Sequence, residues 1–227
     1  MPKQFIPLFG ADSTFQRTMK LPSDPSVFGG PIVITNEDYR FTAQDQLQAI
    51  GVSASLVLEP ARRDSAAAVA AATMLASAQA EDAVVGVFAA DHVVQDGQLF
   101  VRACAEAGRV AAAGRIVTIG VPPTHPATGY GYIRPGADLG GGARKVDALV
   151  EKADAARAAQ ILLDGYLWNS GNFIFSARTM REEFESHAPE VIGPVAESIA
   201  RARRDLGFSC STRRRSHAPR KFRSTTP

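Results

Sequence analysis

Residues 83–92 read AVVGVFAADH, and this stretch decides the fold class. Its first seven residues, 83–89, are apolar almost without interruption, and valine and phenylalanine favour strands. A short apolar run of this kind is typical of a strand that is buried on both faces of a parallel sheet. We therefore expect residues 83–89 to form an interior strand, with Asp91 and His92 just beyond its carboxyl end.

The segments on either side of this strand alternate between β-branched runs and alanine-rich helical stretches. They are, in chain order, a strand at 31–35, a helix at 37–50, a strand at 55–59, a helix at 64–80, and, after the central strand, a helix at 99–113 and a strand at 115–121. Such alternation predicts an α/β fold with a doubly wound, mostly parallel sheet.

The regular alternation of predicted strands and helices ends at Pro122. The expected elements are strands at 129–134 and 145–151 around a glycine-rich turn at 140–142, a helix at 154–163, the segment WNSGNFIF at 168–175, and amphipathic stretches at 177–187 and 191–206. From residue 209 to residue 227 the chain has almost no apolar residues, so we predict that this tail is disordered.

Composition excludes several classes of protein. Hydrophobic residues make up 45% of the chain and charged residues 21%, as in globular proteins. No apolar run approaches the roughly 20 residues of a membrane span, and the N-terminus lacks the apolar stretch of a signal peptide. The two cysteines, Cys104 and Cys210, are too few for a disulfide framework. We expect a cytoplasmic protein with no membrane partner.

The net charge of +2 comes from the tail alone. Residues 209–227 contain six arginines and lysines and no acid, so the remainder has 19 basic and 23 acidic residues, a net charge of −4. A nucleic-acid-binding domain usually spreads its basic residues over a folded face. We therefore expect no nucleic-acid partner.

Polar residues follow several predicted strands, and in open α/β sheets ligands bind beyond the carboxyl ends of the strands. Asp91 could bind Mg²⁺ beside the phosphates of a nucleotide, or could cap the turn that follows. Residues 60–65, PARRDS, lead into a helix whose free N–H groups suit an anion, although a capped surface helix explains them equally. Glu151 and Lys152 could hold a sugar and its phosphate, or could be solvated surface.

An ordered set of motifs resembles bacterial mannose-1-phosphate guanylyltransferases, many of which carry a C-terminal mannose-6-phosphate isomerase domain. The motifs are PKQF at 2–5, PLFG at 7–10, ITNE at 34–37, EP at 59–60, RDSA at 63–66, ADH at 90–92, TGYGYI at 128–133, VEK at 150–152 and WNSG at 168–171. The resemblance covers residues 2–208, and it implies a GT-A-like, Rossmann-related nucleotidyltransferase fold.

The resemblance also implies an activity and its residues. Such enzymes join mannose 1-phosphate and GTP into GDP-mannose and release pyrophosphate, with Mg²⁺ and without a covalent intermediate. By position, the catalytic residues would be Lys3, Asp91 and Lys152, with Asp91 as the metal ligand. The remaining implied contacts are Arg63, Asp64 and Ser65 along the nucleotide and Tyr130, Gly131, Glu151 and Asn169 around the sugar.

The sequence departs from this family at both ends. The family begins with an apolar strand and a glycine-rich loop directly before PKQF, where this chain has Met1. We therefore expect residues 1–208 to form an incomplete domain that lacks its first strand, leaving the neighbouring strands with unpaired apolar edges. The family's second metal-binding aspartate has no counterpart near Phe208, and Asp64 stands where the family usually has asparagine.

These departures predict weak or absent activity for this chain. Other readings are another sugar-1-phosphate nucleotidyltransferase, a non-catalytic remnant of the family, and a nucleic-acid binder that acts through the tail. The chain could act as a monomer or as a homo-oligomer.

Overall fold

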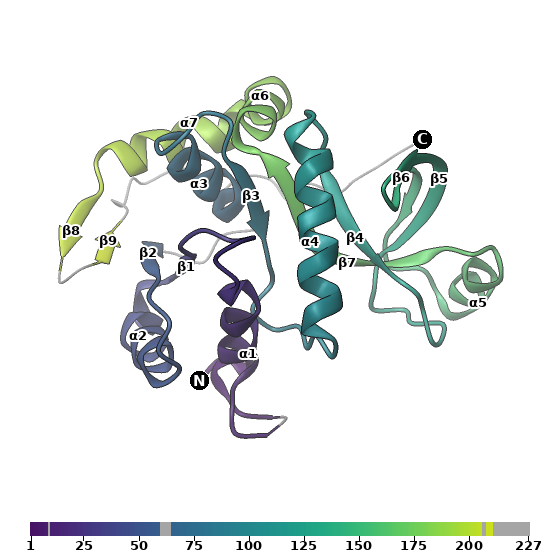
Figure 1. Cartoon of the computed structure of the whole chain (residues 1–227), viewed down its shortest axis with the longest axis horizontal. Coiled ribbons are helices and arrows are strands. Elements are labelled where there is room, and N and C mark those ends of the chain that lie inside the picture. Colours follow the sequence, from purple (N-terminus) through teal and green to yellow (C-terminus); the bar gives the residue numbers. More distant parts are fainter. Residues whose placement is uncertain (9, 60–64, 206–207, 211–227) are drawn as a thin grey trace.

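The computed structural model describes the chain except for residues 9, 60–64, 206–207 and 211–227 (Figure 1). The elements are, in chain order, η1 (Lys3–Phe5), α1 (Thr14–Lys20), η2 (Leu21–Ser23), β1 (Ile32–Asn36), η3 (Glu37–Tyr39), α2 (Arg40–Ala49), β2 (Ser55–Glu59), α3 (Ser65–Ser77), β3 (Val84–Val87), α4 (Gly97–Ala112), β4 (Val117–Val121), β5 (Tyr132–Gly140), β6 (Ala143–Val150), α5 (Ala155–Leu163), β7 (Leu167–Ser176), α6 (Ala177–His187), α7 (Pro189–Ala200), β8 (Arg203–Asp205) and β9 (Phe208–Cys210).

The strands form two sheets rather than one. The first has the order β1-β2-β9-β8, and the second has the order β3-β7-β5-β6, with β4 also paired to β7. Among the described residues, β1 pairs only with β2 and β3 pairs only with β7, so each leaves one edge free.

The direction of the strands refines the predicted, mostly parallel sheet. Pairing is parallel between β1 and β2 and between β2 and β9. In the second sheet every pairing is antiparallel: β7 runs opposite to β3, β4 and β5, and β6 runs opposite to β5. Strand and helix alternate as predicted as far as β4, while the strands that follow it have a different pattern.

The prediction that residues 83–89 are buried on both faces is wrong. Val84 is 45% exposed, and Val85 and Val87 are only partly buried. The reason lies in the pairing of β3: α3 and α4 both contact this strand, but β7 is its single paired neighbour in the described part of the chain. An apolar sequence predicted the strand correctly, but the burial of a strand depends also on its neighbours.

The N-terminal segment is held against the first sheet by an aromatic core. Phe5 and Phe15 are 3% exposed and meet edge to face, with 5.2 Å between ring centroids, and they pack with Val33 of β1. Helix α1, which the sequence analysis did not predict, begins with a capping box: Ser13 Oγ accepts a hydrogen bond from Gln16 N, and Ser13 N donates to Gln16 Oε1. This packing anchors the short η1 helix that carries Lys3.

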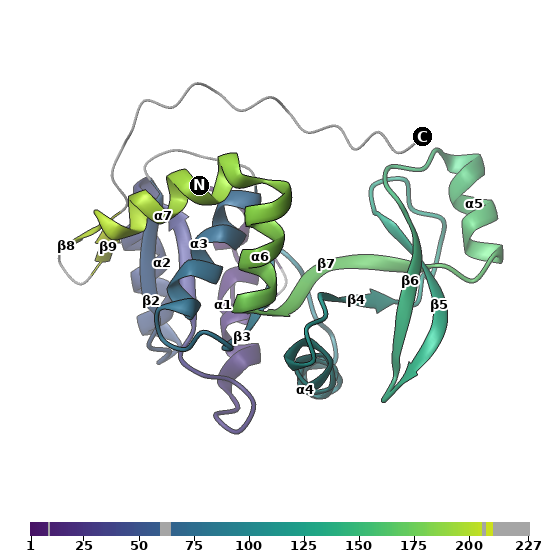
Figure 2. The same cartoon turned by 90° about the horizontal axis from the view of Figure 1, so that it is seen from above.

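Strand β7 connects the two halves of the molecule. Figure 2 shows it running from α6, beside α3 and α7, across to β5, β6 and α5. At one end its Ile174 and Phe175 are buried. At the other end Trp168 packs on a cluster that includes the fully buried Tyr132 and Ile161. Residues 168–172 of β7 therefore lie between two buried clusters.

The C-terminal region continues the first sheet beyond the predicted domain boundary at residue 208. Strand β9 aligns Ser209 with Val57 and Cys210 with Leu58. The rest of the predicted tail, residues 211–227, lies outside the described residues. Within the described part of the chain, none of the helices combines the length and the apolar character required to span a bilayer.

Candidate active site

Asp91 lies beyond the carboxyl end of β3 and forms an ion pair with Lys3. Lys3 Nζ is 3.0 Å from Asp91 Oδ2, and His92 Nε2 is 3.7 Å from Asp91 Oδ1. The Asp91 side chain is 37% exposed, so its carboxylate remains accessible. Ala90 packs on the aromatic core that anchors η1, and this explains how residues 3 and 91 meet despite their separation in sequence.

The pKa of Asp91 is lowered from its ordinary value of 3.8. Partial burial opposes ionisation and raises the pKa, but the hydrogen bond and the positive charge of Lys3, helped by His92, outweigh it. Because the folded-state pKa lies below the unfolded one, ionised Asp91 contributes stability above pH 3.8, and this contribution is lost as the pH falls through the folded pKa. Asp91 is therefore a carboxylate at neutral pH.

We predict that Lys3→Gln raises the pKa of Asp91, because the opposing burial remains when the ammonium group is removed. A ¹³C NMR titration of the Asp91 carboxyl carbon across the acidic range measures the shift. Lys20→Gln is the matched control, since Lys20 pairs with Asp12 instead. An unchanged Asp91 titration in Lys3→Gln would contradict the ion pair.

A second group of predicted residues meets where β5, β6 and β7 come together. Tyr132 of β5 is paired with Val150 of β6 and with Trp168 of β7, so the residues next to these positions are neighbours. Asn169 N donates a hydrogen bond to Gly131 O at 2.8 Å. Glu151 lies against Gly131 as well, because a Cβ added to Gly131 would be 2.5 Å from Glu151 Oε1.

Aromatic rings border this group. The ring of Tyr130, which is 52% exposed, meets the Trp168 indole with 5.1 Å between centroids and an interplanar angle of 71°. The His125 ring meets the same indole with 5.1 Å between centroids and an interplanar angle of 73°. Trp168 Nε1 is buried and has no hydrogen-bond acceptor among the described residues. The exposed ring of Tyr130 thus lies against Trp168, which directly precedes Asn169.

Lys152 has an unusual backbone conformation. Its φ of 52° is in the left-handed region, and it is the single non-glycine residue with positive φ among those described. This conformation costs a lysine roughly 1 kcal/mol and is found preferentially at functional sites. The Lys152 side chain is exposed and follows Glu151 directly. The strained backbone therefore supports Lys152 as a candidate functional residue.

Two contacts join the Asp91 region to the second group. Ala89 N donates a hydrogen bond to Asn172 Oδ1 at 3.4 Å, linking the end of β3 to the segment after Asn169. A Cβ added to Gly171 would be 3.9 Å from His92 Cε1, so His92 and Gly171 are neighbours. The motifs at 90–92 and 168–171 therefore form one continuous rim at this end of the second sheet.

The predicted nucleotide-binding residues are only partly described. Arg63 and Asp64 lie outside the described residues. Ser65 is the first residue of α3 and is exposed. The sequence analysis overlooked three residues of the rim: Thr118, which donates to Asn169 Oδ1, Asn172, which accepts from Ala89, and His125. Asn172 directly follows the WNSG motif, so the sequence could have predicted it as a site residue. No sequence motif indicates such a role for Thr118 or His125.

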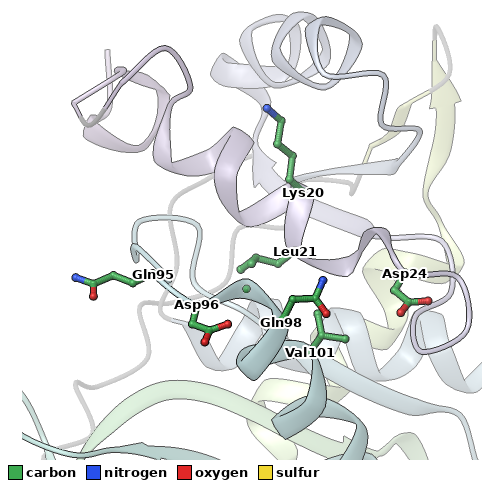
Figure 3. A pocket seen from close by; sticks show the side chains of 8 residues that line it. Lys20, Leu21, Asp24, Gln95, Asp96, Gln98 and Val101 are labelled. Atoms are coloured by element: carbon green, nitrogen blue, oxygen red, sulfur yellow. The ribbon is translucent and has the colours of Figure 1, made fainter.

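A separate pocket lies between η2 and the start of α4, and Figure 3 shows the side chains around it. Its lining residues are Lys20, Leu21, Asp24, Gln95, Asp96, Gly97, Gln98 and Val101. None of the predicted site residues is among them. Its charged groups have other roles, because Lys20 pairs with Asp12, Asp24 accepts from Ser26, and Asp96 caps α4 through Leu99 N.

The two joined groups lie at strand ends, which is where α/β proteins bind their ligands. The nucleotidyl transferase family matches residues 1–211, and the chain belongs to this family. It is 43% identical over 209 residues to a mannose-1-phosphate guanylyltransferase of Sinorhizobium fredii, a match that covers 91% of this chain and 41% of the relative. It is 41% identical over 210 residues to the xanthan biosynthesis protein XanB of Xanthomonas campestris, covering 92% of this chain and 44% of that protein.

Solved structures of similar fold are consistent with membership of this family. A Thermus thermophilus protein named mannose-1-phosphate geranyltransferase has a TM-score of 0.78 and 32% identity, covering 89% of this chain and 58% of that chain. A Helicobacter pylori protein named mannose-6-phosphate isomerase has a TM-score of 0.79 and 25% identity, covering 92% and 80%. These likenesses confirm the predicted nucleotidyltransferase-like fold. The chain spans less than half the length of the curated relatives described above.

Proposed function

We propose that this chain carries the substrate site of a mannose-1-phosphate guanylyltransferase, which forms GDP-mannose and pyrophosphate from mannose 1-phosphate and GTP. The observation that supports it most is the rim that joins the Asp91 region to Gly131, Glu151 and Asn169 through Ala89, Asn172 and His92. A nucleotidyl transfer requires a sugar-phosphate site and a nucleotide site side by side, and the polar groups of this rim would contribute to both.

The polar groups of the rim suit the two parts of mannose 1-phosphate. Glu151 would accept hydrogen bonds from sugar hydroxyls, and Asn169 would bind the sugar from the opposite strand, with Tyr130 beside it. Lys152 would place a positive charge on the phosphate. That phosphate attacks the α-phosphorus of GTP, a new P–O bond forms, and the bond to the leaving pyrophosphate breaks.

Lys3 and Asp91 would act on the nucleotide phosphates, with Ser65, Arg63 and Asp64 along the nucleotide. Asp91 fits the role of a magnesium ligand because its carboxylate is ionised and accessible. The described residues contain no cluster of three or more potential metal ligands, so phosphate oxygens and water would complete the shell, which is how proteins usually hold Mg²⁺. Bound Mg²⁺ would neutralise charge on the phosphates.

Pyrophosphate release from GTP and mannose 1-phosphate tests the proposal directly. We expect activity that requires both substrates and Mg²⁺ and disappears with EDTA, and we expect mannose 1-phosphate to bind with or without turnover. Glucose 1-phosphate, ATP and dTTP are the comparison substrates. Preference for another sugar phosphate or base would assign a different nucleotidyltransferase, and binding without turnover would indicate a non-catalytic member. Absence of mannose 1-phosphate binding would refute the proposal.

We predict that Gly131→Ala weakens mannose 1-phosphate binding about tenfold or more with little change in stability. The added Cβ would be 2.5 Å from Glu151 Oε1, so the carboxylate must move away from its place beside Gly131. Only the end of a flexible side chain is displaced, which leaves the backbone intact. Isothermal titration calorimetry and thermal unfolding measure the two effects. Gly129→Ala, with nothing within 4 Å of its added Cβ, is the matched control. Equal affinities for the two variants would contradict this geometry.

A further inference from the structure

Strand β7 is irregular at the WNSG motif. Against β4, Phe173 is aligned with Thr118 and Asn169 with Gly120, so β7 uses four steps where β4 uses two. The extra residues form a bulge in which Gly171 has a φ of 69°. Bulges of this kind redirect side chains and are common beside active sites. This bulge determines how the side chain of Asn169 is held.

The Asn169 side chain accepts two hydrogen bonds, both at its amide oxygen, Oδ1. Gly171 N donates to Asn169 Oδ1 at 3.1 Å, and Thr118 Oγ1 donates to the same atom at 2.8 Å. A backbone N–H can only donate, so the group that faces Gly171 must be the amide oxygen. The orientation of the amide is thereby determined by protein contacts.

The amide nitrogen of Asn169 consequently faces away from these partners. Its Nδ2 makes no hydrogen bond to any described residue, and it is not among the buried unpaired atoms of this part of the chain. The backbone of Asn169 is held as well, because its N–H donates to Gly131 O at 2.8 Å. Asn169 therefore presents two N–H donors, which match an oxygen acceptor on a ligand.

We infer that Thr118 is a positioning residue that orients the Asn169 amide so that Nδ2 donates to an oxygen of the bound sugar phosphate. The inference rests on the proposed function and deepens it. The Thr118 hydroxyl has one proton and two acceptors in reach, Asn169 Oδ1 at 2.8 Å and Asn172 O at 3.1 Å. The shorter contact is with the Asn169 side chain, so the Thr118 hydroxyl holds the Asn169 amide against strand β4.

Thr118→Val removes the hydroxyl proton while keeping the branched shape that β4 requires, and Thr118→Ser keeps the hydroxyl. Because a neutral hydrogen bond is lost, we expect Thr118→Val to bind mannose 1-phosphate roughly three- to tenfold more weakly than the wild type, with GTP binding unchanged. Thr118→Ser should restore the affinity. Thr73→Val is the matched control, since its buried hydroxyl donates to Val69 O in α3, away from the rim.

A double-mutant cycle and a ligand-free measurement complete the test. Added to Asn169→Ala, Thr118→Val should cause no further loss of affinity, because the two residues act as one unit. In the free protein, ¹⁵N relaxation of the Asn169 side-chain amide should show greater mobility in Thr118→Val and wild-type rigidity in Thr118→Ser. Unchanged relaxation in Thr118→Val, or additive losses in the cycle, would overturn the inference. If the wild type bound no mannose 1-phosphate, the proposed function would fail, and relaxation alone would decide the role of Thr118.

Discussion

Asp91→Asn is expected to lower the rate of pyrophosphate release from GTP and mannose 1-phosphate by about 10²- to 10³-fold, the usual cost of one lost electrostatic contact in a transition state. Asparagine has the same shape and still accepts a hydrogen bond from Lys3, so the rim keeps its geometry. What disappears is the negative charge that would hold Mg²⁺ against the phosphates. Mg²⁺-dependent GTP binding should weaken in parallel, and the affinity for mannose 1-phosphate alone should stay unchanged.

Asp12→Asn provides the matched control for this variant. Asp12 pairs with Lys20 at 2.5 Å, and its side chain is 34% exposed, close to the 37% of Asp91. Exposed ion pairs contribute little, at most about 1 kcal/mol, so both variants should melt within a few degrees of the wild type. A loss of activity shared by Asp12→Asn, or normal Mg²⁺ dependence in Asp91→Asn, would show that Asp91 is not the metal ligand.

The position of the candidate site was predictable because it depends on strand ends. A strongly apolar run placed β3, and Asp91 follows it, in the place where ligands bind in α/β sheets. Glu151 and Asn169 follow from the resemblance of their motifs, and the structure brings them together through the pairing of Tyr132. The strained φ of Lys152 and the bulge after Asn169 were not predictable, since both depend on contacts with other strands.

The overall fold was predictable only where local sequence determines it. Helices α4 and α5 follow amphipathic patterns that end within a few residues of the predicted bounds. The antiparallel direction of β7 has no local signal, because the same apolar residues fit a parallel or an antiparallel neighbour. Helix α1 was missed although Ser13 and Gln16 have capping-box spacing, since seven residues are too few to show a helical period.

Strand β7 connects the two halves of the molecule. Phe175→Ala in this strand is expected to destabilise the protein by about 3–5 kcal/mol. Phe175 is completely buried and aligned with Val85 of β3, in the one strand that also pairs with β4 and β5 among the described residues. Deleting the ring leaves a cavity at that junction. Phe41→Ala is the control, since Phe41 is 51% exposed and its loss should cost far less.

Urea denaturation of the two variants measures the difference in the free energy of unfolding. A domain is usually stable by only about 5–15 kcal/mol, so Phe175→Ala should remove a large part of the total. Asn169 lies on the same strand but at its other end, and Tyr132 and Ile161 support that end independently. At temperatures where Phe175→Ala is still folded, mannose 1-phosphate should therefore bind normally. A small loss of stability, or weak binding by the folded variant, would show that β7 does not separate the core from the site in this way.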